Sequence, residues 1–513
     1  MCRFSVRCLL SISLSLLGAR AGAQAPAVAH VEETARKETP AAPTAVAPVA
    51  AIYRHQLFGT LPIATRSDDA RKLLEKSIDQ YENVLLEMSV DNAQKAASKD
   101  SHFALAYAIW SYAASRTQPV PDALQKAKAL APKASPDEQL LVNWLIDVQQ
   151  GDNLAAIGAM NDLLARFPTD KHVLYLTAEW LYFQQDYDRS RQMFEKIAEI
   201  DPNFPPALNM LGYAYMETGD PDPAKAISYL KRYAALQPNQ PNPQDSLGEV
   251  LRFAGDDQGS LEHYTASLKI ITNFINSQVG MGDTYALMGD YAHARAEYDK
   301  AVPMATNSRD RLHAQFQKAL VYFWEGQPES GRKALSILAE EAQRSKDPYA
   351  QFEIGFGRAD LAPSAAEQLD QLRALEATVE KPVPGMSEPD RHISWASVVR
   401  EEARIAALTG RPNVAQEAIF KLENSAALTR DLIVTNSYES ARGFLLFSQG
   451  DFAGAVDELA ADPHSTLALQ QLVLAQEKLS NTAAAESTRT RLKYQRAPTV
   501  EWYLTTHSAA EAR

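Results

Sequence analysis

Hydrophobic residues along this chain recur at helical spacing, in pairs of segments with a turn signal between them. One pair places Leu211 and Tyr215 before the turn, and Ala226 and Leu230 after it. A spacing of three or four residues puts apolar side chains on one face of a helix. The pattern therefore predicts helix–turn–helix units, each with an apolar face that a neighbouring unit must cover.

The turns between the two helices of successive units carry a repeated residue pair. Glycine supplies the left-handed backbone of such a turn, and aspartate can cap the second helix. The pairs, 34, 34, 36 and 34 residues apart, are Gly151-Asp152, Gln185-Asp186, Gly219-Asp220, Gly255-Asp256 and Gly289-Asp290. A fixed period of this length indicates a helical solenoid. The one longer interval contains Asp220-Pro221-Asp222-Pro223, which predicts an extended turn.

A small residue on each first helix would let the second helix approach closely. Gly212 and Gly282 occupy this position, and a large residue follows three positions later. Together with the period, these residues resemble the tetratricopeptide repeat, a helix–turn–helix unit of 34 residues. The resemblance is strongest over 139–304, and weaker units follow around Gly326, Gly410 and Gly450. It implies an all-α fold, a right-handed superhelical solenoid of such repeats.

Composition changes along the chain suggest a division into six parts. The period is lost after about residue 340 and returns near residue 390. The predicted parts are a signal peptide (1–23), a disordered Ala/Pro-rich tether (24–50), an N-terminal repeat array (51–340), an irregular helical joint (341–389), a degenerate C-terminal array (390–496) and a loose tail (497–513).

The N-terminal segment has the pattern of a cleaved secretory signal. Arg3 and Arg7 precede a short apolar run, and Ala21-Gly22-Ala23 forms a small-residue cleavage site. The alternative is a membrane anchor, but the run is about half the ~20 residues that a spanning helix needs. We therefore expect export to the periplasm or beyond, as in a bacterial cell-envelope protein. Both cysteines lie in this segment, so the mature chain would contain none.

The overall composition is that of a folded soluble chain. Apolar residues make up 46% of the sequence and charged residues 22%, with a formal net charge of −13. This acidic balance argues against nucleic acid and against anionic membranes as partners. No later apolar stretch is long enough to be an integral membrane span.

Motifs that would indicate catalysis are absent from the sequence. It contains no H-E-x-x-H zinc-protease motif, no phosphate-binding P-loop and no G-x-S-x-G nucleophile elbow. No two of the ten histidines are three or four residues apart, the spacing of metal ligands on one helix face. We therefore predict no enzyme, no cofactor and no metal, while a site assembled from distant residues stays open.

The resemblance implies that the first helices line a concave groove and that fixed positions of each unit face a partner. Carried over residue by residue, the predicted groove residues are Tyr175, Glu179, Tyr182, Asn209, Tyr213, Met216, Asp245, Glu249, Arg252 and Asp283. Aromatic, amide and carboxylate groups together suit a protein or peptide of polar or basic character. The alternative is a solvated surface of an acidic protein.

These observations favour an exported scaffold that mediates protein–protein interaction in the cell envelope through a concave groove. One alternative is an enzyme or enzyme subunit, with its site in the joint. Another is a carbohydrate- or peptide-binding component of an envelope assembly system. The sequence identifies neither the partner nor the oligomeric state.

Overall fold

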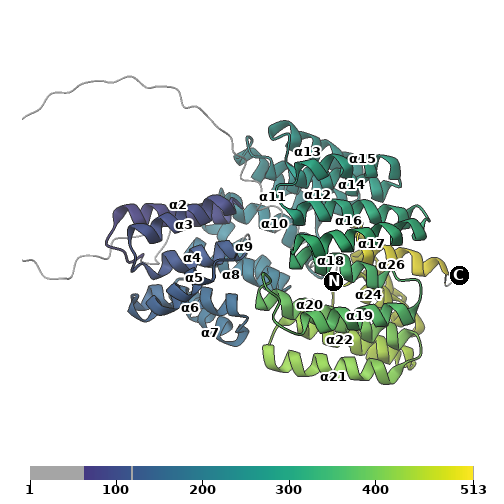
Figure 1. The fold of residues 1–513 in the computed structure, drawn as a ribbon. Helices are drawn as coiled ribbons and strands as arrows, with labels where there is room; N and C mark the ends of the chain where they lie inside the picture. The colour runs from purple at the N-terminus through teal and green to yellow at the C-terminus, as the bar shows by residue number, and fades with distance from the viewer. Residues whose placement is uncertain (1–62, 117–118, 512–513) are drawn as a thin grey trace, which may run out of the picture.

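The fold is a chain of antiparallel helix pairs, seen in a computed structural model that describes residues 63–116 and 119–511 (Figure 1). The predicted signal peptide and tether lie outside the described residues. The regular secondary structure within them is entirely helical, which confirms the all-α prediction.

Twelve successive pairs and one final helix make up the described part of the array. The N-terminal pairs are α2 (Asp68–Glu82) with α3 (Leu86–Lys99), α4 (Ala104–Ser115) with α5 (Pro121–Leu130), α6 (Pro136–Gln150) with α7 (Asn153–Arg166), α8 (Lys171–Phe183) with α9 (Tyr187–Ile200), α10 (Pro205–Glu217) with α11 (Pro223–Leu236), and α12 (Asn242–Ala254) with α13 (Asp257–Ile270). The C-terminal pairs are α14 (Ile275–Met288) with α15 (Tyr291–Ala301), α16 (Ser308–Trp324) with α17 (Pro328–Ser345), α18 (Pro348–Asp360) with α19 (Ala365–Val379), α20 (Glu388–Leu408) with α21 (Pro412–Thr429), α22 (Leu432–Ser448) with α23 (Phe452–Ala460), and α24 (Thr466–Lys478) with α25 (Thr482–Lys493), followed by α26 (Val500–Glu511).

The repeated turn residues have the roles expected of them. Gly289 ends α14 with a positive φ of 80°, and the Asp290 carboxylate accepts the backbone N–H of His293 at 3.2 Å. A residue with positive φ followed by a capping aspartate also occurs at residues 151–152, 185–186 and 255–256. The lengthened turn differs, because Asp222 caps α11 in place of Asp220.

Glycines on the first helices lie where the paired helices nearly touch. A Cβ atom added to Gly282 would stand 2.6 Å from the Tyr298 ring on α15. A Cβ at Gly212 would overlap the Leu230 side chain on α11. These close approaches confirm the predicted repeat phase.

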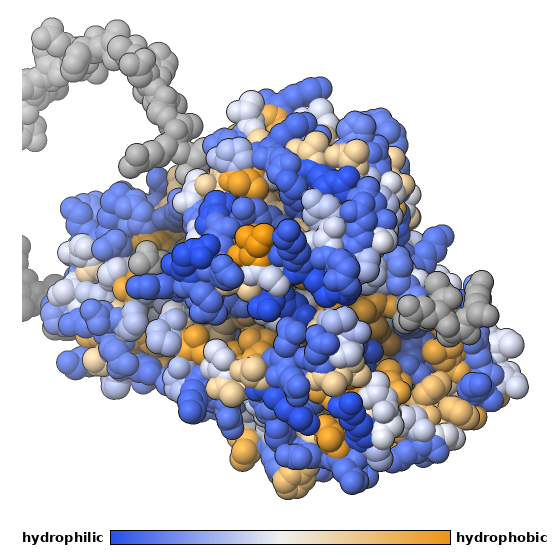
Figure 2. All heavy atoms as spheres, turned by 45° about the vertical axis from the view of Figure 1, so that its right-hand side comes forward, coloured by the Kyte–Doolittle hydropathy of each residue, from blue (hydrophilic) through white to orange (hydrophobic). Residues whose placement is uncertain are grey.

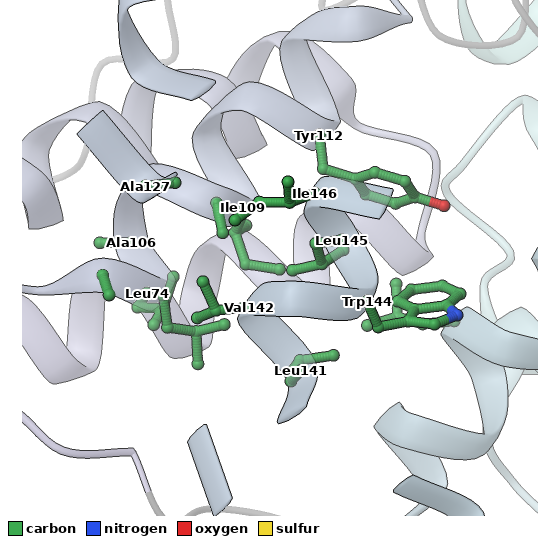
Figure 3. Close-up of a cluster of buried hydrophobic side chains, with 14 of the residues drawn as sticks. Leu74, Ala106, Ile109, Tyr112, Ala127, Leu141, Val142, Trp144, Leu145 and Ile146 are labelled. Atoms are coloured by element: carbon green, nitrogen blue, oxygen red, sulfur yellow. The ribbon is translucent and has the colours of Figure 1, made fainter. Parts of the chain in front are cut away.

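Large side chains fill the spaces between units. In Figure 3 the Tyr112 and Trp144 rings lie together at one side of a cluster of smaller apolar residues. Their ring centroids are 6.2 Å apart, and Trp144 makes an edge contact with Trp180 on α8 at 6.3 Å. Trp144 is fully buried. An aromatic series thus joins the first helices of successive units.

The array curves with its first helices on the inside. Neighbouring first helices contact one another, as in α10 with α12 and α12 with α14, whereas neighbouring second helices make no comparable contact in the described residues. A solenoid bends toward the side on which its helices are closer. The first helices therefore form the concave side.

The curve is tight enough for the array to meet itself. α6 contacts α20, seven pairs further along the chain. Asn153 donates from its side chain to Asp431 at 3.2 Å, and Arg496 reaches Asp257 at 3.1 Å. We call this line of contact the seam. Its members on the N-terminal side are Gly151, Asn153, Gln185, Tyr187 and Asp257, and on the C-terminal side Pro389, Asp431, Asn436, His464 and Arg496.

Two segments differ from the sequence-based division. Residues 341–389, predicted as an irregular joint, contain the regular pair α18 and α19, so the array continues without a break. Residues 497–513, predicted as a loose tail, contain α26, whose first residue Val500 is fully buried against α16 and α18. The last helix covers an apolar end of the array that would otherwise face water.

Hydrophilic residues predominate on the face shown in Figure 2, and hydrophobic residues form small separate patches on it. Within residues 63–116 and 119–511, no helix is both long and apolar enough to cross a bilayer.

Candidate partner-binding site

The ten predicted groove residues lie on four successive first helices, as the repeat phase implied. α8 carries three of them, α10 three, α12 three and α14 one. Nine of the ten side chains are buried, and Tyr213 is partly exposed. The expectation that these positions are open to solvent is therefore wrong, because the tight curvature brings other elements against them. Their contact with a partner stays a prediction.

Glu179 shows how these positions are covered. Its carboxylate accepts the Tyr81 hydroxyl of α2 at 2.6 Å and the Arg116 guanidinium at 2.9 Å. Burial and the neighbouring carboxylate raise the pKa of Tyr81 well above its usual range. The end of α2, three first helices earlier in the array, thus occupies the position that the sequence assigned to a partner.

Two further contacts fix the end of α2 against α8. The Glu82 carboxylate lies 2.6 Å from Nδ1 of His172, and the Tyr175 hydroxyl donates to the Glu82 carbonyl at 3.3 Å. Burial lowers the pKa of His172, but the Glu82 and Asp170 carboxylates together raise it above its usual value. His172, Tyr175 and Glu179 are therefore bound to a segment of the same chain.

A cluster of charged side chains is buried between α12 and α14. Arg252 forms ion pairs with Asp283 and with Glu249, and each of the three side chains is at most 5% exposed. Tyr298 donates to Asp283 at 2.8 Å, and Tyr213 donates to Glu249 at 3.0 Å. The acids that were expected to attract a basic partner are therefore neutralised largely within the fold.

Asp245 is the third carboxylate of this cluster. It accepts the Ser277 hydroxyl at 2.6 Å and is 3% exposed. Burial raises the pKa of Asp245 to about 7, against the opposing effect of the Ser277 hydrogen bond. Asp245 can therefore hold a proton near neutral pH, which reduces the excess negative charge around Arg252.

A pocket of about 420 Å³ opens beside this covered surface. The α2–α3 turn forms one wall, and three turns that join successive units form the other. These turns precede α10, α12 and α14 and contribute Phe204, Gln240 and Phe274. A volume of this size holds a side chain with part of its backbone or a small molecule. The sequence analysis missed this pocket, because the α2–α3 turn lies far from these units in sequence.

A second pocket, of about 500 Å³, is lined by α17, α18 and α19. Its lining includes Phe352, Leu375 and Met386, with Gly355 on α18. It falls in the segment where the sequence period is lost. The described residues contain no group of three or more His, Cys, Asp or Glu that could hold a metal ion.

Comparison with known sequences finds the same repeat. Residues 181–248 match one family model of the tetratricopeptide repeat, and residues 275–306 match another. No curated protein matches the chain.

Comparison with solved structures finds helical-repeat proteins. Yeast Tom70 is 14% identical with a TM-score of 0.41, over 82% of this chain and 96% of its own. A thermophilic TPR protein of Thermus thermophilus is 18% identical with a TM-score of 0.30, over 34% of this chain and 92% of its own. A tetratricopeptide repeat protein of Parabacteroides merdae is 14% identical with a TM-score of 0.34, over 53% of this chain and 93% of its own.

Proposed function

This chain is a tetratricopeptide repeat protein, and we propose that it serves as an exported scaffold that binds a protein partner in the cell envelope. Repeat arrays of this kind offer long surfaces built from similar units, which suits recognition of another chain. Export is supported by Arg3 and Arg7, the apolar run after them and the Ala21-Gly22-Ala23 pattern.

The observation that carries the binding proposal is the pocket beneath the α2–α3 turn. The concave positions next to it are held by internal hydrogen bonds and ion pairs, such as Glu179 with Arg116. The pocket in contrast is open and combines aromatic with amide side chains, as at Tyr233 and Asn242. A partner segment therefore enters from the edge of the groove.

The polar or basic character of the partner rests on charge outside the buried cluster. The chain has a formal net charge of −13, and Asp79 is an exposed carboxylate on the wall of the pocket. Complementary charge accelerates association and selects among partners more than it adds affinity. A basic residue in the bound segment meets this requirement.

The test uses the full chain with a C-terminal affinity tag, expressed in the cells that produce it. Membrane, periplasmic and cytosolic fractions are crosslinked, purified on the tag and identified by mass spectrometry, with an unrelated exported protein carrying the same tag as the control. We expect a mature N-terminus near Gln24 and one protein enriched in amounts comparable to the bait. An intact Met1 terminus in the cytosol, with no protein enriched over the control, would contradict the proposal.

The alternatives weighed from the sequence make different predictions for the same experiment. If the chain is an enzyme subunit, catalytic partners would be purified with it, and their activity would fall when the chain is removed. A carbohydrate-binding component would retain glycan, not protein, after crosslinking. No observation in the described residues favours either.

A further inference from the structure

Five of the turns that join successive units share a hydrogen bond, and three of these share a residue type. Before α4, α8, α10, α12 and α14, a backbone N–H at the start of the first helix donates to the carbonyl three residues earlier. Phe103, Phe204 and Phe274 are the donors before α4, α10 and α14, at 3.1, 3.1 and 3.2 Å. All three rings are at most 6% exposed. The chain thus uses a phenylalanine as a wedge between neighbouring units.

The turn before α12 has the same hydrogen bond but lacks the ring. Gln240 donates its backbone N–H to the Gln237 carbonyl at 3.1 Å, so it occupies the position of the phenylalanines. Its side chain is exposed. The turn before α8 also departs from phenylalanine, but there Asp170 caps the helix through two backbone N–H groups. At Gln240 nothing among the described residues takes the place of the wedge.

The pocket lies at this position. Phe204 and Phe274 line it from the turns on either side, and Gln240 lines it between them. The Tyr233 ring and Ile271 add apolar surface, so an aromatic side chain bound here would have surroundings similar to those of Phe204. Phe204 shows what these surroundings are: it packs against Tyr175 at a ring distance of 6.1 Å and under the Lys171 ammonium at 4.5 Å.

The polar atoms of the pocket suit the backbone that accompanies such a side chain. Oδ1 of Asn242 is shielded from solvent and has no hydrogen-bond partner among the described residues, while its Nδ2 donates to the Tyr233 hydroxyl at 3.0 Å. A buried acceptor without a donor is unfavourable, and a peptide N–H would satisfy it. Asp79 adds a negative charge to the rim.

The opposite wall carries backbone strain. Val84 in the α2–α3 turn has a φ of +63°, a left-handed conformation that a β-branched residue rarely adopts. Most equivalent turns use glycine, as at Gly151, Gly255 and Gly289, and two others use the unbranched residues Gln185 and Ser480. Strain of this kind is concentrated at functional sites, where a particular side chain is needed in a fixed place. In this turn the strain places Val84 and Leu85 on the wall of the pocket.

We propose that this pocket binds an aromatic side chain of a partner protein, presented in an extended segment beside a basic residue. The aromatic ring replaces the missing phenylalanine wedge, a peptide N–H donates to Asn242, and the basic residue meets Asp79. The proposal rests on the scaffold function and names the chemistry of the segment that is bound.

The test measures binding of two synthetic peptides to the full chain, independently of any native partner. The probe is acetyl-Gly-Lys-Phe-Gly-amide, and the control peptide has alanine in place of phenylalanine. Saturation-transfer NMR and calorimetric titration give the affinities. We expect the phenylalanine peptide to bind roughly tenfold more tightly or better, because one buried aromatic side chain contributes at least this factor.

Three variants place the binding site. Gln240→Phe supplies the missing ring from the chain itself and should weaken the phenylalanine peptide by roughly tenfold or more, because the site is then filled. Gln416→Phe adds the same ring at an exposed position of α21 and should leave the affinity unchanged. Asp79→Lys should weaken binding at low salt and have little effect at high salt, because exposed charges are screened.

These measurements can contradict the proposed binding in the pocket without deciding whether the protein is a scaffold. Equal affinity for the two peptides, or unchanged binding to Gln240→Phe with a native circular dichroism spectrum, would show that this pocket takes no aromatic side chain. A scaffold function would then still be judged by crosslinking in cells. If Gln240→Phe loses helicity, the proposal is judged from Asp79→Lys and from the affinities of the two peptides for the unaltered chain.

Discussion

Arg252 on α12 and Asp283 on α14 form an ion pair in which each side chain is only 1% exposed. The pair joins the first helices of two successive units, and Glu249 shares the same guanidinium. Nearby Tyr264 and Asp283 raise the pKa of Arg252 despite its burial. The guanidinium is therefore charged at every physiological pH.

Arg252→Met should be strongly destabilising. It leaves Asp283 and Glu249 buried without their cation, a situation that typically costs about 3–5 kcal/mol. Urea unfolding and amide hydrogen exchange of α12 and α14 measure the loss. Arg489→Met is the matched control, since Arg489 is 45% exposed and its ion pairs contribute about 0–1 kcal/mol. Equal effects of the two substitutions would mean that the buried pair adds no stability.

Substitution of glycine by alanine should have opposite effects on stability at two helical positions. Gly282→Ala brings a Cβ to 2.6 Å from the Tyr298 ring, which is held by its hydrogen bond to Asp283, and should cost about 1–3 kcal/mol. Gly158 lies on α7 with no atom near its would-be Cβ. Gly158→Ala should stabilise the protein by about 0.5–1 kcal/mol, because alanine favours the helix. Thermal unfolding of both variants reveals the signs, and the same sign at both sites contradicts the packing described.

The backbone strain at Val84 in the α2–α3 turn can be tested by two opposite substitutions in two different turns. Gly289→Val introduces a β-branched residue at a φ of +80° with free space around it, so the change isolates backbone strain and should cost about 1–2 kcal/mol. Val84→Gly relieves the same strain at the α2–α3 turn and should be neutral or stabilising by up to about 1 kcal/mol. A clear destabilisation by Val84→Gly would mean that the side-chain contacts of Val84 outweigh its strain.

Stability should fall as the pH rises toward neutrality. Burial raises the pKa of Asp245 to about 7, whereas an unfolded chain has a value of about 3.9. The folded state therefore holds the proton more tightly, and its stability decreases between about pH 4 and 7 and levels off above. Glu138 behaves in the same way, with burial raising its pKa to about 7.

The charge-free variants Asp245→Asn and Glu138→Gln test this dependence. Each should gain stability over the unaltered protein at about pH 8 and differ little from it at about pH 4.5, because only the ionised carboxylate is unfavourable in the fold. Melting temperatures across this range suffice. A gain that is independent of pH would assign the effect to packing, not to the proton.

Opening the seam should expand the molecule. Arg496→Glu replaces the cation facing Asp257 with a second carboxylate, and it removes a donor to the Arg252 carbonyl. Small-angle X-ray scattering should then show a larger radius of gyration with unchanged helicity. Arg489→Glu, away from the seam on α25, is the control, and an identical radius for both variants would show that other contacts keep the array closed.

The local architecture could be predicted because each unit carries its own signals. The Gly-Asp pairs gave the turns, and Gly212 and Gly282 gave the phase of the packing. The start of α20 depends on a similarly local contact, since the Ser387 hydroxyl accepts the N–H of Asp390 at 3.2 Å. These features depend on neighbours within a few tens of residues.

The candidate site could not be predicted in the same way. Burial of Glu179 depends on Tyr81, 98 residues away, and on the curvature summed over the two intervening units. The regular pair α18 and α19 was missed because its turn lacks the Gly-Asp signal. A signal for the pocket was nevertheless present, since Gln240 stands between Phe204 and Phe274 at equivalent positions of successive turns.

The seam also limits how this protein can change over evolutionary time. Open repeat arrays gain and lose units freely, because each unit contacts only its immediate neighbours. In this chain the contact of Asn153 on α7 with Asp431 at the start of α22 requires the seven pairs that lie between them. Duplication or deletion of a single unit between them would shift every seam partner by one position. The number of units is therefore fixed by closure, and divergence has to proceed by substitution within units.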